Sequence, residues 1–228
     1  MMMEKAERTE AGQTGHVARS DDGANPIAPQ PDIPETGPAK RRLESRRKLM
    51  EAARRLFVER GYHATRPQDI SREAGVGHGT FYLHFDDKLD CFLAFGDEAA
   101  SELDVIIAAH LVSVQTLDDA VLEMLRGIFE YSRKNPGVLA AALTDISVLS
   151  TGEEVDRVVP ADRWSLGWGR FLAEMQAKGH VAPDVDTTLA GYLIVGAIRQ
   201  GGAYASLNGL DRDSTIEAMA KLFVRALK

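Results

Sequence analysis

The sequence has little of several residue types and motifs that would restrict its class. A single cysteine, Cys91, excludes an intrachain disulfide and any two-cysteine metal or redox motif. No apolar run approaches the roughly 18–20 residues of a membrane span, and residues 193–198 end at a charge. Met1 to Arg8 are charged where a signal peptide would turn apolar. We therefore expect a cytoplasmic protein with no membrane partner.

Catalytic motifs are missing as well. No Gly-x-Ser-x-Gly turn and no paired acid and histidine motif indicates hydrolysis. The glycines within residues 75–79 lack the spacing of a dinucleotide-binding loop, and they follow an expected helix rather than a strand. His63, His78 and His84 do not have the spacing of metal ligands. The sequence thus predicts a protein that is not an enzyme and uses no cofactor or metal.

Charge is distributed unevenly, so the net charge of −7 conceals three different segments. Residues 1–39 hold three basic and seven acidic residues, residues 40–85 hold eleven basic and five acidic ones, and residues 86–228 hold thirteen basic and twenty-two acidic ones. A short basic block before a long acidic one indicates contact with a polyanion by one part of the chain and a separate role for the rest. The alternative is that the basic block is the solvated face of one helix.

The spacing of apolar residues predicts an all-α fold. Residues 1–39 contain five of the nine prolines and few large apolar side chains, so we expect a disordered tail there. From Lys40 onward helical periodicity dominates, and no segment shows the sustained alternation of a strand. The expected helices are residues 42–60, 67–74, 78–84, 88–110, 117–134, 136–149, 160–178, 187–207 and 214–227.

Capping residues set several of these boundaries. Gly61 and Gly179 are expected to end helices, because glycine readily adopts the left-handed conformation that follows a last turn. Side-chain oxygens that can accept hydrogen bonds from a first turn mark several starts. The expected N-terminal caps are Thr116, Asn135, Asp186 and Ser214.

Residues 66–85 are the segment most informative about function. Pro67 can begin a short helix, because its missing N–H would be unpaired there anyway. Gly75 supplies a tight turn, and the next helix directs Phe81 and Phe85 inward. The outward residues are then His78, Gly79, Thr80, Tyr82 and His84. Two short helices joined by a glycine turn predict a helix-turn-helix, whose second helix enters the major groove of DNA.

The surrounding residues add a larger set at fixed spacing. The set is Ala52-Ala53-x-x-Leu56-Phe57, Gly61-Tyr62, Thr65, Asp69-Ile70, Ala74-Gly75-Val76, Gly79-Thr80-Phe81-Tyr82-x-x-Phe85 and Lys88. From about Arg47 to Phe95 the sequence therefore resembles the tetracycline-repressor (TetR) family of bacterial transcription regulators. The resemblance implies an N-terminal three-helix DNA-binding domain, here residues 40–87, followed by a larger helical domain for effector binding and dimerisation, here residues 88–228.

The resemblance also implies which residues meet double-stranded DNA. Thr65, Tyr82 and Lys88 match positions that typically touch phosphates. Arg66 and Gly77 stand where the family usually has capping Ser or Thr residues, Pro67 replaces an aliphatic residue, and His78 replaces a common lysine. Base preference therefore cannot be inferred from relatives. The expected DNA contacts are Thr65, Arg66, Gln68, Gly77, His78, Thr80, Tyr82, His84 and Lys88.

One expected helix carries both tryptophans of the chain. Trp164, Trp168 and Phe171 share one side of it, and Leu125 and Phe129 on another helix can face them. Ordinary core is the alternative for such a stripe. Because only 7% of the residues are aromatic, their gathering favours a pocket for a flat apolar ligand. The expected ligand-binding residues are Leu125, Phe129, Trp164, Trp168, Phe171 and Tyr192.

The last two expected helices are the candidate homodimer interface. Residues 187–207 are rich in glycine and alanine, which allow close helix approach. The resemblance places the dimer on this helix and on residues 214–227, and tight packing within one monomer is the alternative. The sequence as a whole predicts a homodimeric repressor released from a palindromic operator by a small apolar or aromatic effector. The alternatives are an effector-independent architectural DNA-binding protein and a helical ligand-binding protein that has lost DNA binding.

Overall fold

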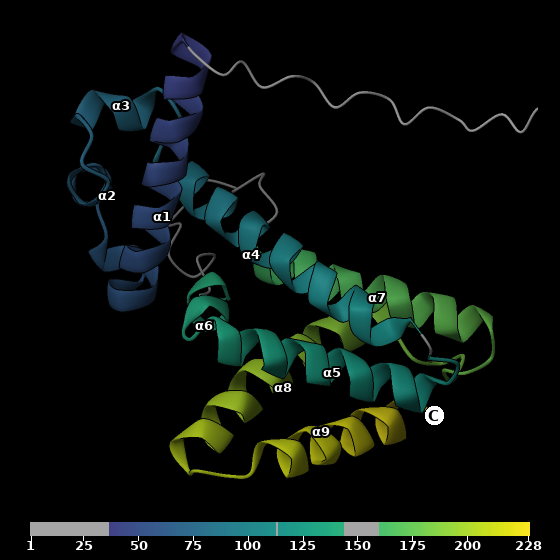
Figure 1. The fold of residues 1–228 in the computed structure, drawn as a ribbon. Coiled ribbons are helices and arrows are strands. Elements are labelled where there is room, and N and C mark those ends of the chain that lie inside the picture. The colour runs from purple at the N-terminus through teal and green to yellow at the C-terminus, as the bar shows by residue number, and fades with distance from the viewer. Residues whose placement is uncertain (1–36, 113, 144–159) are drawn as a thin grey trace, which may run out of the picture. The chain divides into compact units, whose positions relative to one another are not determined.

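The computed structural model describes residues 37–112, 114–143 and 160–228. Within these ranges it contains nine helices and no strand, which confirms the predicted all-α fold (Figure 1). The helices are α1 (Pro38–Ala64), α2 (Pro67–Glu73), α3 (His78–Tyr82), α4 (Lys88–Leu111), α5 (Leu117–Lys134), α6 (Val138–Ala142), α7 (Pro160–Ala177), α8 (Thr187–Leu207) and α9 (Arg212–Leu227). The expected tail lies almost entirely outside the described residues.

The first helix is longer than predicted at both ends. α1 begins at Pro38 rather than at residue 42, because proline fits the first turn of a helix. The predicted stop at Gly61 is confirmed as a break, since this residue has φ 77° and ψ 169°. A further turn then continues to Ala64.

α5 and α8 match their predicted ranges, and their expected caps are confirmed. Thr116 and Asp186 each accept a hydrogen bond from the backbone N–H three residues along, at 3.1 and 3.0 Å. Gly179 follows α7 with φ 78°, as expected of a residue that ends a helix. These boundaries were predictable because the capping interaction is local in sequence.

The predicted helix over residues 136–149 had the wrong start. α6 begins at Val138, because Gly137 has φ 79° and so cannot join a right-handed helix. A β-carbon at Gly137 would lie 2.7 Å from Val58 Cγ1 on α1, so a larger residue at this turn would also collide with the Val58 side chain. Residues 144–149 of the predicted helix lie outside the described residues.

α9 and α3 also differ from their predicted ranges. α9 begins at Arg212, because Asp211 rather than Ser214 is its cap and accepts from the Ser214 N–H at 2.9 Å. α3 ends at Tyr82 instead of residue 84, because the Leu83 N–H reaches back only three residues, as in a tighter turn.

Aromatic side chains join α1 to the start of α4. Phe57 on α1 meets Phe92 and Phe95 on α4 at ring-centroid distances of 5.1 and 5.6 Å. Tyr62, after the break in α1, contacts the Phe92 ring edge-on at 4.9 Å. Each such pair adds about 0.5–1.5 kcal/mol beyond its buried area. The position of α4 is therefore fixed relative to the helix-turn-helix.

A polar cluster joins α1, α4 and α5. The Arg54 guanidinium donates two hydrogen bonds to the Glu102 carboxylate, at 2.8 and 2.9 Å, and a third to Asn135 Oδ1 at 2.9 Å. The Tyr131 hydroxyl donates to Glu102 Oε2 at 2.7 Å. Paired N–H donors on one carboxylate form the strong, orientation-specific type of ion pair. Glu102 thus receives donors from α1 and α5.

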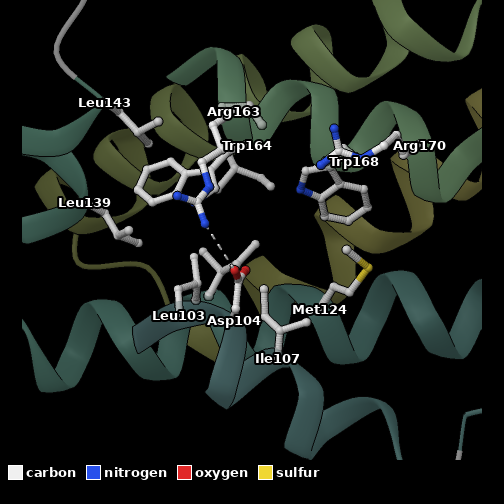
Figure 2. Close-up of a pocket in the computed structure, with 14 residues that line it drawn as sticks. Leu103, Asp104, Ile107, Met124, Leu139, Leu143, Arg163, Trp164, Trp168 and Arg170 are labelled. Carbon is white, nitrogen blue, oxygen red and sulfur yellow. Dashed lines mark ion pairs between the residues drawn. The ribbon is translucent and has the colours of Figure 1, made fainter. Parts of the chain in front are cut away.

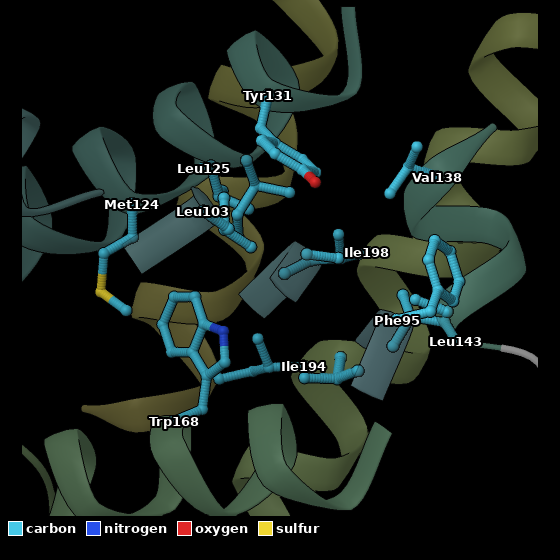
Figure 3. Packing of buried hydrophobic residues seen from close by; sticks show 14 of the residues in the cluster. Phe95, Leu103, Met124, Leu125, Tyr131, Val138, Leu143, Trp168, Ile194 and Ile198 are labelled. Atoms are coloured by element: carbon cyan, nitrogen blue, oxygen red, sulfur yellow. The ribbon is translucent and has the colours of Figure 1, made fainter. Parts of the chain in front are cut away.

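The helices that follow share one hydrophobic core (Figure 3). Trp168, Ile194 and Ile198 from α7 and α8 are buried together with Leu103 from α4 and Leu125 from α5. α7 and α8 lie especially close to each other along much of their length. This core surrounds the cavities described below.

Candidate nucleic-acid interface and ligand cavities

The structure confirms the predicted helix-turn-helix geometry. α2 and α3 are joined by Gly75, whose φ of 66° lets the chain reverse, and the Val76 N–H donates to the Ser71 carbonyl oxygen at 3.0 Å. Ile70 and Phe81 are fully buried under the two helices. The short α3 is therefore held by its apolar side.

α2 begins correctly without the serine or threonine usual at its cap. The Asp69 carboxylate instead accepts a hydrogen bond from the backbone N–H of Arg66 at 3.2 Å. Pro67 occupies the first helical position. The side chains of Arg66 and Gln68 are consequently both exposed at the start of the helix-turn-helix.

The outward face of α3 is accessible over most of its length. Gly77, His78 and Tyr82 are exposed, and Thr80 is half-buried. Tyr82 is 51% exposed, and its ring meets the His78 ring edge-on at 5.2 Å. A large aromatic side chain left in solvent, beside an imidazole, is available to a partner.

The structure contradicts the expected phosphate contact of Thr65. This side chain is fully buried, and its hydroxyl donates to the Gly61 carbonyl oxygen at 2.8 Å. The end of a helix leaves carbonyl groups without partners, and the threonine hydroxyl satisfies one of them. Thr65 therefore stabilises the end of α1.

Two other expected contacts have partners within the chain. His84 Nε2 lies 2.8 Å from Ser45 Oγ on α1, so its ring is not directed freely outward as expected. Lys88 Nζ donates to the Tyr62 carbonyl oxygen at 3.0 Å and lies 4.1 Å from the Tyr62 ring centroid. Burial lowers the pKa of Lys88. Both residues remain at the edge of the helix-turn-helix.

The arginines of the basic block divide into paired and unpaired groups. Arg47, Arg54 and Arg55 form ion pairs with glutamates. By contrast, Arg41 and Arg66 are exposed and have no acidic partner in the described part of the chain. Exposed basic residues without an acidic partner in the described part of the chain thus lie at the N-terminal part of α1, at Arg60 and at the start of α2.

A cavity of about 280 Å³ lies among α4, α5, α6, α7 and α8 (Figure 2). We call it the tryptophan cavity, since Trp164 and Trp168 of α7 line it together with Leu103, Met124 and Val195. Its size is near the lower end of small-molecule sites. α4 therefore contributes both to this cavity and, at Lys88, to the edge of the helix-turn-helix.

Only two of the six expected ligand-binding residues line this cavity, Trp164 and Trp168. Phe171 packs edge-on against Trp168 at 6.1 Å, while Leu125 is fully buried core. Tyr192 is 42% exposed on α8. Leu125, Phe171 and Tyr192 stay predictions that this cavity does not support, because helical spacing identifies a shared face but not the helix that packs against it. Phe129 lines a second cavity, among α5, α6, α8 and α9.

The tryptophan cavity has three charged residues in its lining, Asp104, Arg163 and Arg170. Arg163 lies 3.8 Å from the Asp104 carboxylate on α4 (Figure 2). The buried Trp164 Nε1 has no hydrogen-bond partner among the described residues. A buried N–H without an acceptor is costly, so an acceptor on a bound molecule or a water would stabilise this arrangement.

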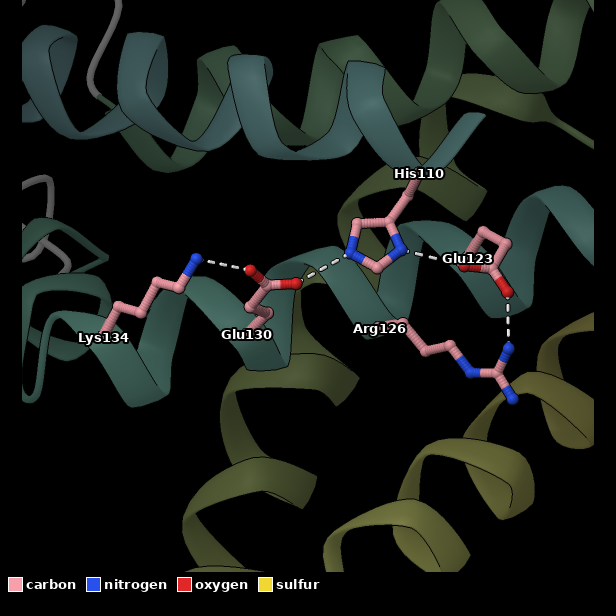
Figure 4. A network of polar contacts seen from close by, with 5 residues as sticks. All are labelled: His110, Glu123, Arg126, Glu130 and Lys134. Atoms are coloured by element: carbon pink, nitrogen blue, oxygen red, sulfur yellow. Dashed lines mark hydrogen bonds and ion pairs between the residues drawn. The ribbon is translucent and has the colours of Figure 1, made fainter. Parts of the chain in front are cut away.

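His110 connects α4 to α5 near the far end of α4 (Figure 4). Its Nδ1 lies 2.8 Å from Glu123 Oε2, and its Nε2 lies 2.9 Å from Glu130 Oε2. These hydrogen bonds, first from Glu123 and then from Glu130, raise the pKa of His110. Arg126 and Lys134 pair with the same two glutamates. Sequence reasoning missed this network, because its members lie on two helices.

No group of three or more His, Cys, Asp or Glu side chains among the described residues is placed to hold a metal ion. None of the described helices combines the length and apolarity needed to cross a membrane.

Comparisons with known proteins agree with this geometry. The family model described as bacterial regulatory proteins, tetR family, matches residues 49–95. The HTH-type transcriptional regulator CymR of Pseudomonas putida is 31% identical over 202 residues, covering 82% of this chain and 95% of CymR. The HTH-type transcriptional repressor AcnR of Corynebacterium glutamicum is 33% identical over 86 residues, covering 38% of this chain and only 41% of AcnR.

Solved structures share the fold across most of the chain. A tetR-family regulator from Shewanella sp. PV-4 has a TM-score of 0.63 at 24% identity, covering 80% of this chain and 97% of its own. FadR of Bacillus subtilis, solved with stearoyl-CoA, has a TM-score of 0.65 at 18% identity, covering 80% of this chain and 100% of its own. With CymR matched over nearly its full length, the helix-turn-helix and the helices behind it place this chain in the tetR family of bacterial regulatory proteins.

Proposed function

We propose that the chain is a homodimeric transcriptional repressor that leaves a palindromic operator when a small effector binds. The exposed α3, held from beneath by Phe81, is the observation that carries this proposal. Repression is favoured over activation by relatives such as AcnR, which is named as a repressor. Residues 40–87 would bind DNA, and residues 88–228 would bind the effector and dimerise.

The proposed DNA contacts follow from exposure. His78, Gly77 and Thr80 would face the groove, and Tyr82 would touch the backbone. Arg66 and Gln68 would reach DNA from the start of α2, whereas Thr65 is left out. Lys88 and His84 would act at the edge of the interface, because both already have partners in the chain.

Binding to a DNA fragment selected in vitro tests this interface. Arg66→Gln should weaken binding and lower the slope of log affinity against log salt by about one, because one phosphate contact is lost. Tyr82→Ala should weaken binding, and His78→Ala should change the preferred base pairs. Lys178→Gln, at the other end of the chain, is the charge-matched control. A double Arg66→Gln/Tyr82→Ala variant with unchanged affinity at every salt concentration would refute the assignment.

The proposed dimer uses α8 and α9. Leu189, Leu193 and Leu207 on α8 are 56%, 64% and 87% exposed, and Leu222 on α9 is 64% exposed. Apolar side chains repeated along one helix indicate a covered face. A two-fold dimer would present two copies of α3 to successive half-sites, which a five-residue helix needs for specificity.

The tryptophan cavity is the proposed effector site. A ligand can release DNA only by favouring the conformation that binds DNA less well, and a tenfold weakening needs about 1.4 kcal/mol of differential affinity. α4 would transmit the change, since it lines the cavity and packs against α1. The architectural alternative is not favoured, because residues 86–228 are acidic and enclose cavities.

Tryptophan fluorescence tests the effector site, because the chain has two tryptophans and both line the cavity. A compound that releases DNA should change their emission. The site would lie elsewhere if such a compound left the emission unchanged and still acted on a Trp164→Ala/Trp168→Ala variant.

A further inference from the structure

The second cavity differs from the tryptophan cavity in its chemistry. It has a volume of about 440 Å³, within the range of small-molecule sites. Arg133, Arg199 and Arg212 line it, from α5, α8 and α9, and we call it the arginine cavity. Much of the remaining lining is apolar, with Phe129, Leu139, Leu143, Ile198 and Leu210 among its residues.

The charge of this lining opposes the charge of its surroundings. Residues 86–228 contain twenty-two acidic and thirteen basic residues, yet no acidic side chain occurs among the described residues of the lining. Three cations around one cavity repel each other, and an anion between them would offset that repulsion.

Within the described residues the three guanidinium groups have few partners. Arg133 has no acidic partner among the described residues, and Arg199 makes one long contact, 3.5 Å, to the Leu143 carbonyl oxygen. Arg212 is paired with the exposed Asp213 outside the lining. Guanidinium groups bind carboxylate or phosphate oxygens in pairs, so they suit an anionic ligand better than a neutral one.

We propose that the arginine cavity binds an amphipathic anion, with its apolar part against the wall around Phe129 and Ile198 and its acidic group between Arg133 and Arg199. The cavity lies against α8 and α9, so its occupant would touch both helices of the proposed dimer. It also shares Ile128, Leu139, Leu143 and Ile198 with the tryptophan cavity, so the two sites are separated by single side chains. The proposed binding of the anion is argued from this geometry alone. An effect of that binding on DNA release rests in addition on the proposed function.

Isothermal titration of the full chain with decanoate, and with 1-decanol as its neutral match, tests the proposal. Decanoate should bind once per chain, and decanol at least tenfold more weakly. An Arg133→Gln/Arg199→Gln variant should lose at least tenfold in decanoate affinity. Arg225→Gln, an exposed α9 residue outside the arginine cavity, should keep the wild-type affinity.

Several outcomes would overturn the proposal. These are equal affinity for decanol, unchanged affinity in the double arginine variant, no decanoate binding at millimolar concentration, or inorganic phosphate binding as tightly as decanoate. Loss of binding in Trp164→Ala/Trp168→Ala but not in the arginine variant would place the ligand in the other cavity. Binding of decanoate without release of DNA would support the site and reject its regulatory role, whereas failure of DNA binding itself would concern only the proposed function.

Discussion

Glu102 is a single carboxylate on which two other helices depend. Burial would raise the pKa of Glu102, but hydrogen bonds from Arg54 and Tyr131 lower it below its ordinary value. Desolvation and the bond to Glu102 raise the pKa of Tyr131. The phenol therefore stays protonated and donates throughout the physiological range. Replacing the carboxylate would leave the Arg54 guanidinium, whose side chain is 24% exposed, with Asn135 Oδ1 as its acceptor among the described residues.

Glu102→Gln is expected to lower the free energy of unfolding by about 1 kcal/mol, because charge-assisted hydrogen bonds are lost from a carboxylate whose 44% exposure screens them in part. Urea denaturation measures this. Glu44→Gln removes a partner of the exposed Arg47 and should lower the free energy of unfolding by less than Glu102→Gln does, because water screens this pair. Equal losses in the two variants would contradict a structural role for the α1–α4–α5 cluster.

His110 makes the free energy of unfolding depend on pH in the opposite direction to a paired carboxylate. Its pKa is raised above 6.5 in the folded chain, so its stabilising contribution is complete below that value and is lost as pH rises through the folded pKa. His110→Gln should therefore reduce the free energy of unfolding more at pH 5.5 than at pH 8.5. Urea titrations at the two pH values measure it, with His180→Gln, an exposed histidine, as control. A larger loss at pH 8.5 would exclude the proposed pairing.

Among the helices, the closest packing is between α7 and α8. A β-carbon at Gly191 of α8 would lie 2.2 Å from the Ser165 carbonyl oxygen and 2.8 Å from the Gly169 nitrogen, and neither backbone atom can move aside alone. α7 also carries both tryptophans of the cavity wall. The shape of that cavity consequently depends on the separation of these two helices.

Gly191→Ala should destabilise the chain by about 1–3 kcal/mol, as overpacking does, and should alter ligand binding in the tryptophan cavity. Gly167→Ala on α7 is the control for stability alone, because Gly167 lines the tryptophan cavity but only the flexible Arg170 side chain lies near it, at 3.9 Å. The control should be unchanged or more stable by up to about 1 kcal/mol, since alanine favours helices. Thermal unfolding of both variants measures the difference. A Gly191→Ala variant as stable as the wild type would mean that α7 and α8 separate easily.

The sequence predicted the elements better than their contacts. Thr116 and Asp186 cap helices as expected, because a cap bonds to the residues that follow it directly. Trp164 and Trp168 lie in the lining of a cavity, whereas Tyr192 is 42% exposed and outside that lining. Periodicity cannot identify which distant helix supplies the opposite wall. The arginine cavity was missed for the same reason, since its three cations come from three helices.

For the molecule as a whole, the exposed face of α8 is expected to determine whether two chains associate. A charge placed in that face would have to be buried unpaired in the proposed dimer, which is strongly unfavourable. The same charge on an exposed apolar site elsewhere would remain in water. The effect of a charge on association therefore distinguishes a leucine in an interface from a leucine that is merely exposed.

Leu193→Glu should convert the dimer to monomer at micromolar concentration and weaken operator binding at least tenfold, because two half-sites are no longer bound together. Sedimentation should show the 24.9 kDa chain mass instead of about twice that value. Val105→Glu, which is 72% exposed on α4, is the control and should leave the dimer intact. A dimeric Leu193→Glu protein would place the interface on another face.

α4 is one uninterrupted helix of 24 residues, which corresponds to a rod about 36 Å long. Its first turn is fixed to the helix-turn-helix, and its later turns line the tryptophan cavity. If a rod of that length pivots about one end through about 5°, its other end moves by about 3 Å. This displacement is nearly the 3.4 Å spacing of successive bases along a DNA strand. A ligand no larger than the cavity could therefore move each recognition helix by almost one base step without melting any helix. In the proposed mechanism, a small displacement of α4 at the tryptophan cavity would be enlarged along the helix. The helix-turn-helix would then no longer be in register with the bases of the DNA.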